Sequence, residues 1–297
     1  MFDIIVELFS LNFVVRAVTV GVLVSLCSAL LGVSLVLKRY SMIGDGLSHV
    51  GFAALGLAAV LGAASPLKVS VPLVLAAALA LLRLGESGKI KGDAAIAVVS
   101  SGSLAIGSVI VEAKGLSSDL SGYMFGTVLA ISDGDFYLSV GTALAVTLLY
   151  VFFYNRIFAT VFDGDFSRAT GVGARLCDWL LAALSALTVV VGMRIMGALL
   201  ISGLIIFPAL SAMRVFKTFK SVAICAAVIS VSCFLAGIIL SYVCEKTAGV
   251  RTPAGASVII VNLAVLLALS ARALFANRNG PPREGNPNSP NDPNGRA

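Results

Sequence analysis

Residues 179–213 read WLLAALSALTVVVGMRIMGALLISGLIIFPALSAM and contain one charged side chain, Arg194. A helix that crosses a membrane needs about 20 predominantly apolar residues, so this stretch is too long for a single crossing. Gly192, Arg194 and Gly197 interrupt its apolar character. The sequence therefore predicts two short spanning helices here, over residues 177–193 and 195–213, with a break between them.

The composition of the whole chain agrees with a membrane location. Hydrophobic residues make up 59% of the chain and charged residues 12%, and the mean hydropathy is +1.02. Soluble domains carry about 25% charged residues, so most of this surface must face lipid. The apolar runs are continuous, which favours helices over the alternating segments of a membrane β-barrel. We predict an all-α, polytopic transmembrane helical bundle of about nine spans (eight to ten) within a transmembrane domain, residues 1–275. The expected spans are 12–37, 46–63, 69–83, 92–112, 135–154, 177–193, 195–213, 221–243 and 254–272.

Loop charge predicts the orientation of this bundle. Most Lys and Arg residues lie in one set of alternate loops, including Lys38, Arg39 and the groups within 83–91, 156–175 and 214–220. Basic loops stay on the cytoplasmic side, so the N-terminus is expected outside and the C-terminus inside. The net charge of +6 then reflects topology and does not indicate nucleic-acid binding. Residues 276–297 are rich in Asn, Pro and Gly and are predicted to be a disordered cytoplasmic tail. Residues 117–132 are too short to span and are expected to be re-entrant or interfacial.

Nothing in the sequence supplies a source of energy. The segment GESGKI at 85–90 resembles a phosphate-binding loop, but its spacing is wrong and Ile90 stands where the hydroxyl residue belongs. No nucleophile–base pair is evident, and the chain has a single His. We therefore predict that the protein is not an enzyme. Either an ion gradient or a partner protein drives whatever it transports.

Asp45 and His49 are the first candidate site. They lie four residues apart, so on a helix their side chains share one face. A carboxylate and an imidazole together suit Zn²⁺ or Mn²⁺, and ionisable groups at membrane depth are candidates for function. Alternatively, Asp45 caps the N-terminus of the second span and His49 is a polar residue between helices. Two ligands do not complete a zinc site, and the sequence does not single out the others.

The second candidate is the region around the end of the 195–213 span. Pro208 removes a backbone donor near the expected end of that helix, and a short amphipathic helix up to about Lys220 is predicted to follow it. Such a helix at the cytoplasmic face could press into a groove on a partner, or lie at the interface with Phe in lipid and Lys at the headgroups. The residues assigned to it are Pro208, Ala209, Met213, Arg214, Phe216 and Lys217.

Together these motifs resemble the permease subunits of bacterial metal-uptake ABC transporters. The resemblance covers about residues 10–270 and is carried, in order, by KRYSMIGDGLSH at 38–49, YMFG at 123–126, FDGDFSRATG at 162–171, and residues 197–214 with Phe207-Pro208. The 162–214 portion also looks like the corresponding part of vitamin B12 and iron-siderophore permeases.

The resemblance implies a multi-pass permease of the bacterial plasma or inner membrane that acts as a homodimer. It implies two further partners, a cytoplasmic ABC ATPase that hydrolyses ATP and an extracytoplasmic metal-binding protein. The cargo would be Zn²⁺, Mn²⁺ or Fe²⁺, with no permanently bound cofactor, and the IGDGLSHV version of the motif at 43–50 favours zinc. Asp45 and His49 become candidate metal contacts, and residues from Pro208 to about Lys220 the candidate coupling helix. The alternative is a gradient-driven secondary cation carrier, which often shows paired broken helices in two related halves; only one broken pair and no repeat is visible here.

Overall fold

The computed structural model describes residues 12–63, 66–86, 92–113, 133–164, 173–249 and 252–278, together with residues 115 and 167. Within these residues there are ten α-helices and no strand. In chain order they are α2 (Asn12–Leu37), α3 (Ile43–Val60), α4 (Pro66–Glu86), α5 (Gly92–Ala113), α7 (Asp133–Phe152), α8 (Tyr154–Phe162), α10 (Ala174–Met196), α11 (Ala198–Val215), α12 (Phe219–Ala248) and α13 (Ala254–Arg278).

Eight of these helices are long and apolar enough to cross a membrane, and a bent pair gives a ninth span. The bent pair is α7 with α8, which meet at 66°. The prediction of an all-α bundle with eight to ten spans is therefore confirmed. The side of the membrane on which each terminus lies stays a prediction.

The outer surface of the bundle is suited to lipid. Large apolar side chains are exposed on several helices, including Val109 on α5 (69%), Leu148 on α7 (68%) and Val228 on α12 (60%). Inside, buried hydroxyl groups donate to carbonyls of their own helix, as Ser185 does to the Leu181 oxygen at 2.7 Å. The hydroxyl groups that bond in this way are satisfied without water.

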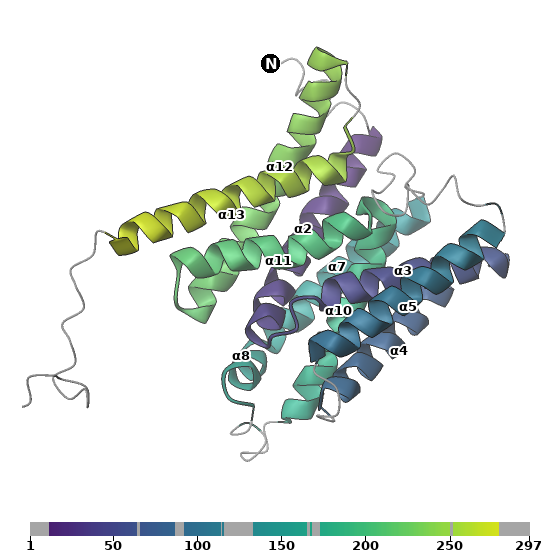
Figure 1. The fold of residues 1–297 in the computed structure, drawn as a ribbon, viewed down its shortest axis with the longest axis horizontal. Coiled ribbons are helices and arrows are strands. Elements are labelled where there is room, and N and C mark those ends of the chain that lie inside the picture. Colours follow the sequence, from purple (N-terminus) through teal and green to yellow (C-terminus); the bar gives the residue numbers. More distant parts are fainter. Residues whose placement is uncertain are drawn as a thin grey trace, which may run out of the picture.

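Helix α3 lies among α4, α5, α10 and α11. In Figure 1, α3, α4 and α5 run side by side at one edge of the bundle, while α11 lies with α12 and α13 on the other side. Glycines make the close contacts of α3 possible. A Cβ added at Gly51 would lie 2.7 Å from the Met193 methyl group of α10, and one at Gly46 would lie 2.9 Å from Ile96 of α5.

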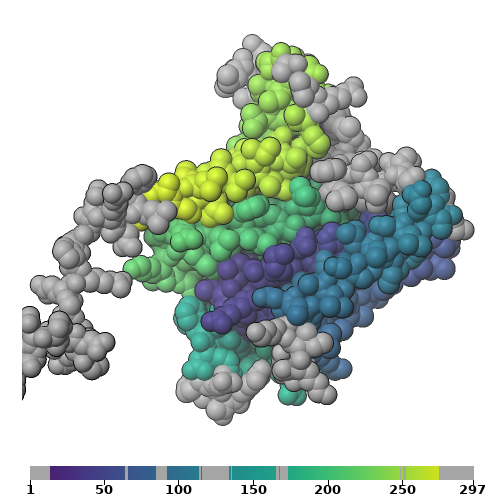
Figure 2. Space-filling view, viewed as in Figure 1, coloured from purple at the N-terminus to yellow at the C-terminus, as the bar shows by residue number. Residues whose placement is uncertain are grey.

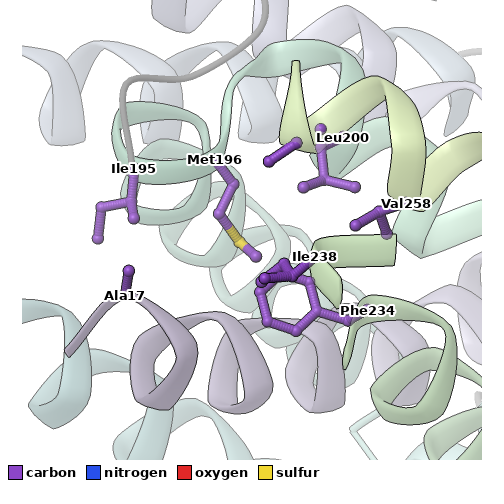
Figure 3. A pocket seen from close by; sticks show the side chains of 9 residues that line it. Ala17, Ile195, Met196, Leu200, Phe234, Ile238 and Val258 are labelled. Carbon is purple, nitrogen blue, oxygen red and sulfur yellow. The ribbon is translucent and has the colours of Figure 1, made fainter. Parts of the chain in front are cut away.

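The long apolar stretch is divided into two helices, as predicted, but the break lies at Gly197 and not between 193 and 195, because α10 continues through Gly192 and Arg194 to Met196. Gly197 has φ 89° and ψ 155°, a conformation that only glycine adopts easily, and it separates α10 from α11. A small apolar cavity lies beside the break, and Figure 3 shows Met196, Phe234 and Val258 turned towards it from three helices. Helix α11 continues for two turns beyond Pro208, to Val215, so Pro208 does not end its helix.

Two predictions fall wholly or mainly outside the described residues. The segment 117–132 lies outside them entirely. For the tail predicted at 276–297, α13 continues to Arg278, past the expected boundary at 275, and the remainder lies outside the described residues.

The packing between helices should tolerate an added side chain least well at Gly32. A Cβ added there would lie 2.0 Å from the Ile205 carbonyl oxygen, which is backbone and cannot move aside. We expect Gly32→Ala to lower the free energy of unfolding by about 1–3 kcal/mol, the usual cost of overpacking. The matched control is Gly141→Ala on α7, where the added methyl group meets nothing within 4 Å. Thermal unfolding of the full chain in detergent checks this, and equal midpoints for the two variants would contradict the packing described.

Candidate functional site

The Asp45–His49 pair lies in the first turns of α3. The His49 Nε2 atom is 3.6 Å from the Asp45 Oδ2 atom, and the two side chains are 19% and 37% exposed. The structure thus brings the pair together on one helix face, as the four-residue spacing predicted. Both side chains remain partly open to an incoming ion.

A tight turn between α2 and α3 fixes where α3 begins. Arg39 has a positive φ of 62°, and the Tyr40 amide donates to the Leu35 carbonyl at 2.9 Å. Helix α3 then starts at Ile43, with Met42 in the N-cap position and no side-chain cap. Asp45 is therefore not the N-cap of this helix, and that interpretation is wrong.

Asp45 instead occupies the first turn of α3, where a carboxylate interacts favourably with the positive end of the helix dipole. The Ser48 hydroxyl donates to the Asp45 backbone oxygen at 2.7 Å and not to its carboxylate. Within the described chain, the Asp45 carboxylate is paired with the His49 imidazole.

One stripe of α3 is left partly uncovered by the rest of the chain. The residues at four-residue intervals, Asp45, His49, Ala53 and Leu57, are only half-buried, whereas Leu47 and Ser48 are fully buried. Figure 2 shows α3 (purple) reaching the surface between α11 (green) and α5 (blue) on the face that is drawn. The pair therefore lies on a surface that another molecule, or the membrane, must cover.

The described chain does not complete a metal shell by itself. No group of three or more His, Cys, Asp or Glu side chains in the described residues is arranged to hold an ion. Of four further acids that could be considered as ligands, only Glu112 has a described side chain, and it lies away from the pair. Glu112 is exposed near the far end of α5, Asp119 lies outside the described residues, and the side chains of Asp133 and Asp135 are not described. A structural zinc site takes four ligands, so two would have to come from elsewhere.

Lys38 and Asp178 form a partly buried ion pair that the sequence did not reveal. The Lys38 Nζ atom contacts the Asp178 Oδ1 atom, and the side chains are only 15% and 12% exposed. Lys38 belongs to the turn that leads into α3, and Asp178 to the second turn of α10. The Lys38–Asp178 pair therefore links the turn before α3 to α10. Neither residue carries a local sequence signal, since they are 140 positions apart.

The residues assigned to a coupling helix are divided by the structure. Pro208 and Ala209 are buried, and Ala209 packs with Ala29 and Val33 of α2. Met213 is half-buried, and Arg214, Phe216 and Lys217 are exposed.

The separate amphipathic helix expected up to Lys220 is not present. Residues up to Val215 belong to α11, Phe216 is extended (φ −118°, ψ 151°), and α12 begins at Phe219. The connection is instead held by Phe219, whose ring lies 5.5 Å from Tyr154 and 5.4 Å from Phe158 of α8. The exposed surface is thus the turn between α11 and α12.

A multi-pass helical bundle with a carboxylate–imidazole pair on an uncovered helix stripe has the architecture of a membrane transport protein. The comparison with known proteins makes this specific. The chain matches the ABC 3 transport family over residues 10–273. It belongs to that family and is a multi-pass cell-membrane permease of a metal ABC transporter. Such permeases are not themselves enzymes, which confirms that prediction.

Similar proteins transport different metals. The manganese transport system membrane protein MntC of Halalkalibacterium halodurans is 27% identical, over 82% of this chain and 83% of its own length. The high-affinity zinc uptake system membrane protein ZnuB of Haemophilus influenzae is 30% identical, over 78% of this chain and 89% of its own. Among solved structures, PsaBC from Streptococcus pneumoniae in complex with Fab matches with a TM-score of 0.78 and 25% identity, over 90% of this chain and 94% of that chain.

The Lys38–Asp178 pair should contribute strongly to stability. Removing one partner leaves the other charge buried and unpaired, which costs about 3–5 kcal/mol in a fully buried pair. Because both side chains here keep some exposure, we expect Lys38→Met to lower the free energy of unfolding by about 2 kcal/mol. The exchange Lys38→Asp with Asp178→Lys should restore part of this loss. Thermal unfolding in detergent checks it, and an exchange variant no more stable than either single reversal would contradict a direct pair.

Proposed function

We propose that this chain is the permease of an importer for a divalent transition metal, with Zn²⁺ as its first cargo and Mn²⁺ or Fe²⁺ as alternatives. The observation that carries the proposal is the Asp45–His49 pair, held 3.6 Å apart on the uncovered stripe of α3 in a member of the ABC 3 transport family. In this proposal the ion is the substrate and is not a resident cofactor. A pathway site with few ligands binds weakly enough to release it.

The incomplete ligand set supports a homodimer. In a twofold-symmetric dimer the same patch of both copies meets itself. If the α3 stripes of two copies face each other, Asp45 and His49 of each give two carboxylates and two imidazoles. That number suffices for a four-coordinate zinc ion, and an oxygen–nitrogen set also suits manganese.

Energy would come from a separate cytoplasmic ATPase, and the metal would be delivered by an extracytoplasmic binding protein. The exposed turn between α11 and α12, with Arg214, Phe216 and Lys217, is the proposed contact for the ATPase. Two basic groups beside an exposed aromatic ring are a suitable surface for a partner with an acidic groove. Pro208 and Ala209 are buried, so in this proposal they support the turn and do not touch the partner.

Loss of the Asp45 carboxylate or of the His49 imidazole should strongly reduce metal uptake. We expect Asp45→Asn and His49→Ala each to reduce ATP-dependent uptake of radioactive zinc into proteoliposomes by roughly tenfold or more, as loss of a metal contact does. The vesicles contain the permease, its ATPase and its binding protein. The matched control is Asp93→Asn, which removes an exposed acid from the first turn of α5. Full uptake by His49→Ala would exclude it from the path, and uptake without ATP would favour the gradient-driven carrier.

Charge reversal on the α11–α12 turn should weaken binding of the ATPase. We expect Arg214→Glu with Lys217→Glu to lower the amount of ATPase that co-purifies with the permease by roughly tenfold, because two favourable charge contacts become repulsive. Lys246→Glu, near the opposite end of α12, is the control. Unchanged co-purification of the double variant would remove this turn from the interface.

A further inference from the structure

A groove between α2, α7, α8 and α12 is not used by the proposed transport path. It has a volume of about 320 Å³ and is lined by Leu30, Tyr150, Val151, Tyr154, Asn155, Lys220, Ala223 and Ile224. Its polar residues sit at one end of these helices, in the first turns of α8 and α12. We propose that this groove binds an anionic phospholipid, with the phosphate at Lys220 and Asn155 and an acyl chain along the apolar part.

The apolar part of the groove continues into the lipid-facing surface. Val151 and Ile224 are 62% and 56% exposed, and both also line the groove. Leu30 lies seven residues before the end of α2, which places it about 10 Å below that end at 1.5 Å per residue. An acyl chain can therefore enter sideways from the bilayer and extend inward beside these residues without crossing a polar barrier.

Two tyrosines of the groove lining are held by contacts within the protein. The Tyr150 ring is fully buried, and its hydroxyl is 2.8 Å from the Ser34 hydroxyl of α2. Tyr154 packs against Phe219 at 5.5 Å between ring centres. Rigid aromatic walls of this kind preserve the shape of the groove whether or not a lipid is present.

The mouth of the groove carries the charge that such a lipid requires. Lys220 is exposed, and its ammonium group forms no ion pair with the part of the chain that the structure describes. Arg156, Arg214 and Lys217 are exposed at the same end of the bundle. Basic side chains close to a membrane surface attract anionic headgroups, whereas a zwitterionic headgroup gains much less. The occupant favoured by both charge and apolar lining is therefore an anionic phospholipid.

Native mass spectrometry of the full-length chain, titrated with phosphatidylglycerol or phosphatidylcholine, tests the proposal. We expect phosphatidylglycerol to bind preferentially and Lys220→Gln to weaken that binding about fivefold, the effect of one basic residue at an anionic surface. Lys246→Gln, which removes the same charge near the other end of α12, should bind as the native chain does. Ala223→Leu keeps the charge but narrows the groove, and it should weaken binding of both lipids.

Three results would overturn the proposal. Equal binding of phosphatidylglycerol by the native chain, Lys220→Gln and Ala223→Leu would show that lipid binds elsewhere. If inorganic phosphate displaced bound phosphatidylglycerol as effectively as added phosphatidylglycerol does, the groove would be a site for free phosphate. A change from dimer to monomer in Ala223→Leu would show that the groove is covered by a second copy. Thermal unfolding of each variant in detergent confirms that a loss of lipid binding does not reflect loss of the fold.

Discussion

The contacts around α3 depend on glycine, and the candidate site depends on those contacts. Gly44, Gly46 and Gly51 bring the helix against Ile205, Ile96 and Met193, at distances that a Cβ would reduce below 3.0 Å. Without a hydrophobic driving force between helices in lipid, such close packing is a main source of their association. Because three sides of α3 are covered in this way, only one stripe remains open. Asp45 and His49 lie on that stripe.

Helices α10 and α11 both pack against the helix that carries the candidate site. The Lys38–Asp178 pair ties the turn before α3 to α10, and Ile205 of α11 touches both Gly32 and Gly44. Between these two helices the backbone is broken only at Gly197. Helix α11, which ends at the α11–α12 turn, packs directly against α3.

Much of the fold could be predicted because membrane helices are defined by length and hydropathy. The nine expected runs correspond to nine of the ten helices in the described residues, and α8 was not predicted. Gly197 was recognised as one of three residues that interrupt the long stretch. Asp45 and His49 could be found because a four-residue spacing brings side chains together on any helix. Lys38 and Asp178 could not, since their contact depends on how α2 and α10 pack. The separate helix expected from Pro208 to about Lys220 was wrong. The turn that contains Pro208 is packed against neighbouring helices, and α11 continues through it to Val215. The N-cap interpretation of Asp45 failed because α3 begins at Ile43.

In the proposed dimer, two copies of the chain share one metal site on their α3 stripes. The most direct measurement is the amount of zinc bound at saturation by the purified permease in lipid nanodiscs, with protein quantified by amino-acid analysis. We expect about one ion for every two chains, a value set by four ligands per zinc, and loss of that ion in Asp45→Asn and in His49→Ala. One ion per chain, or binding that survives both substitutions, would contradict the shared site.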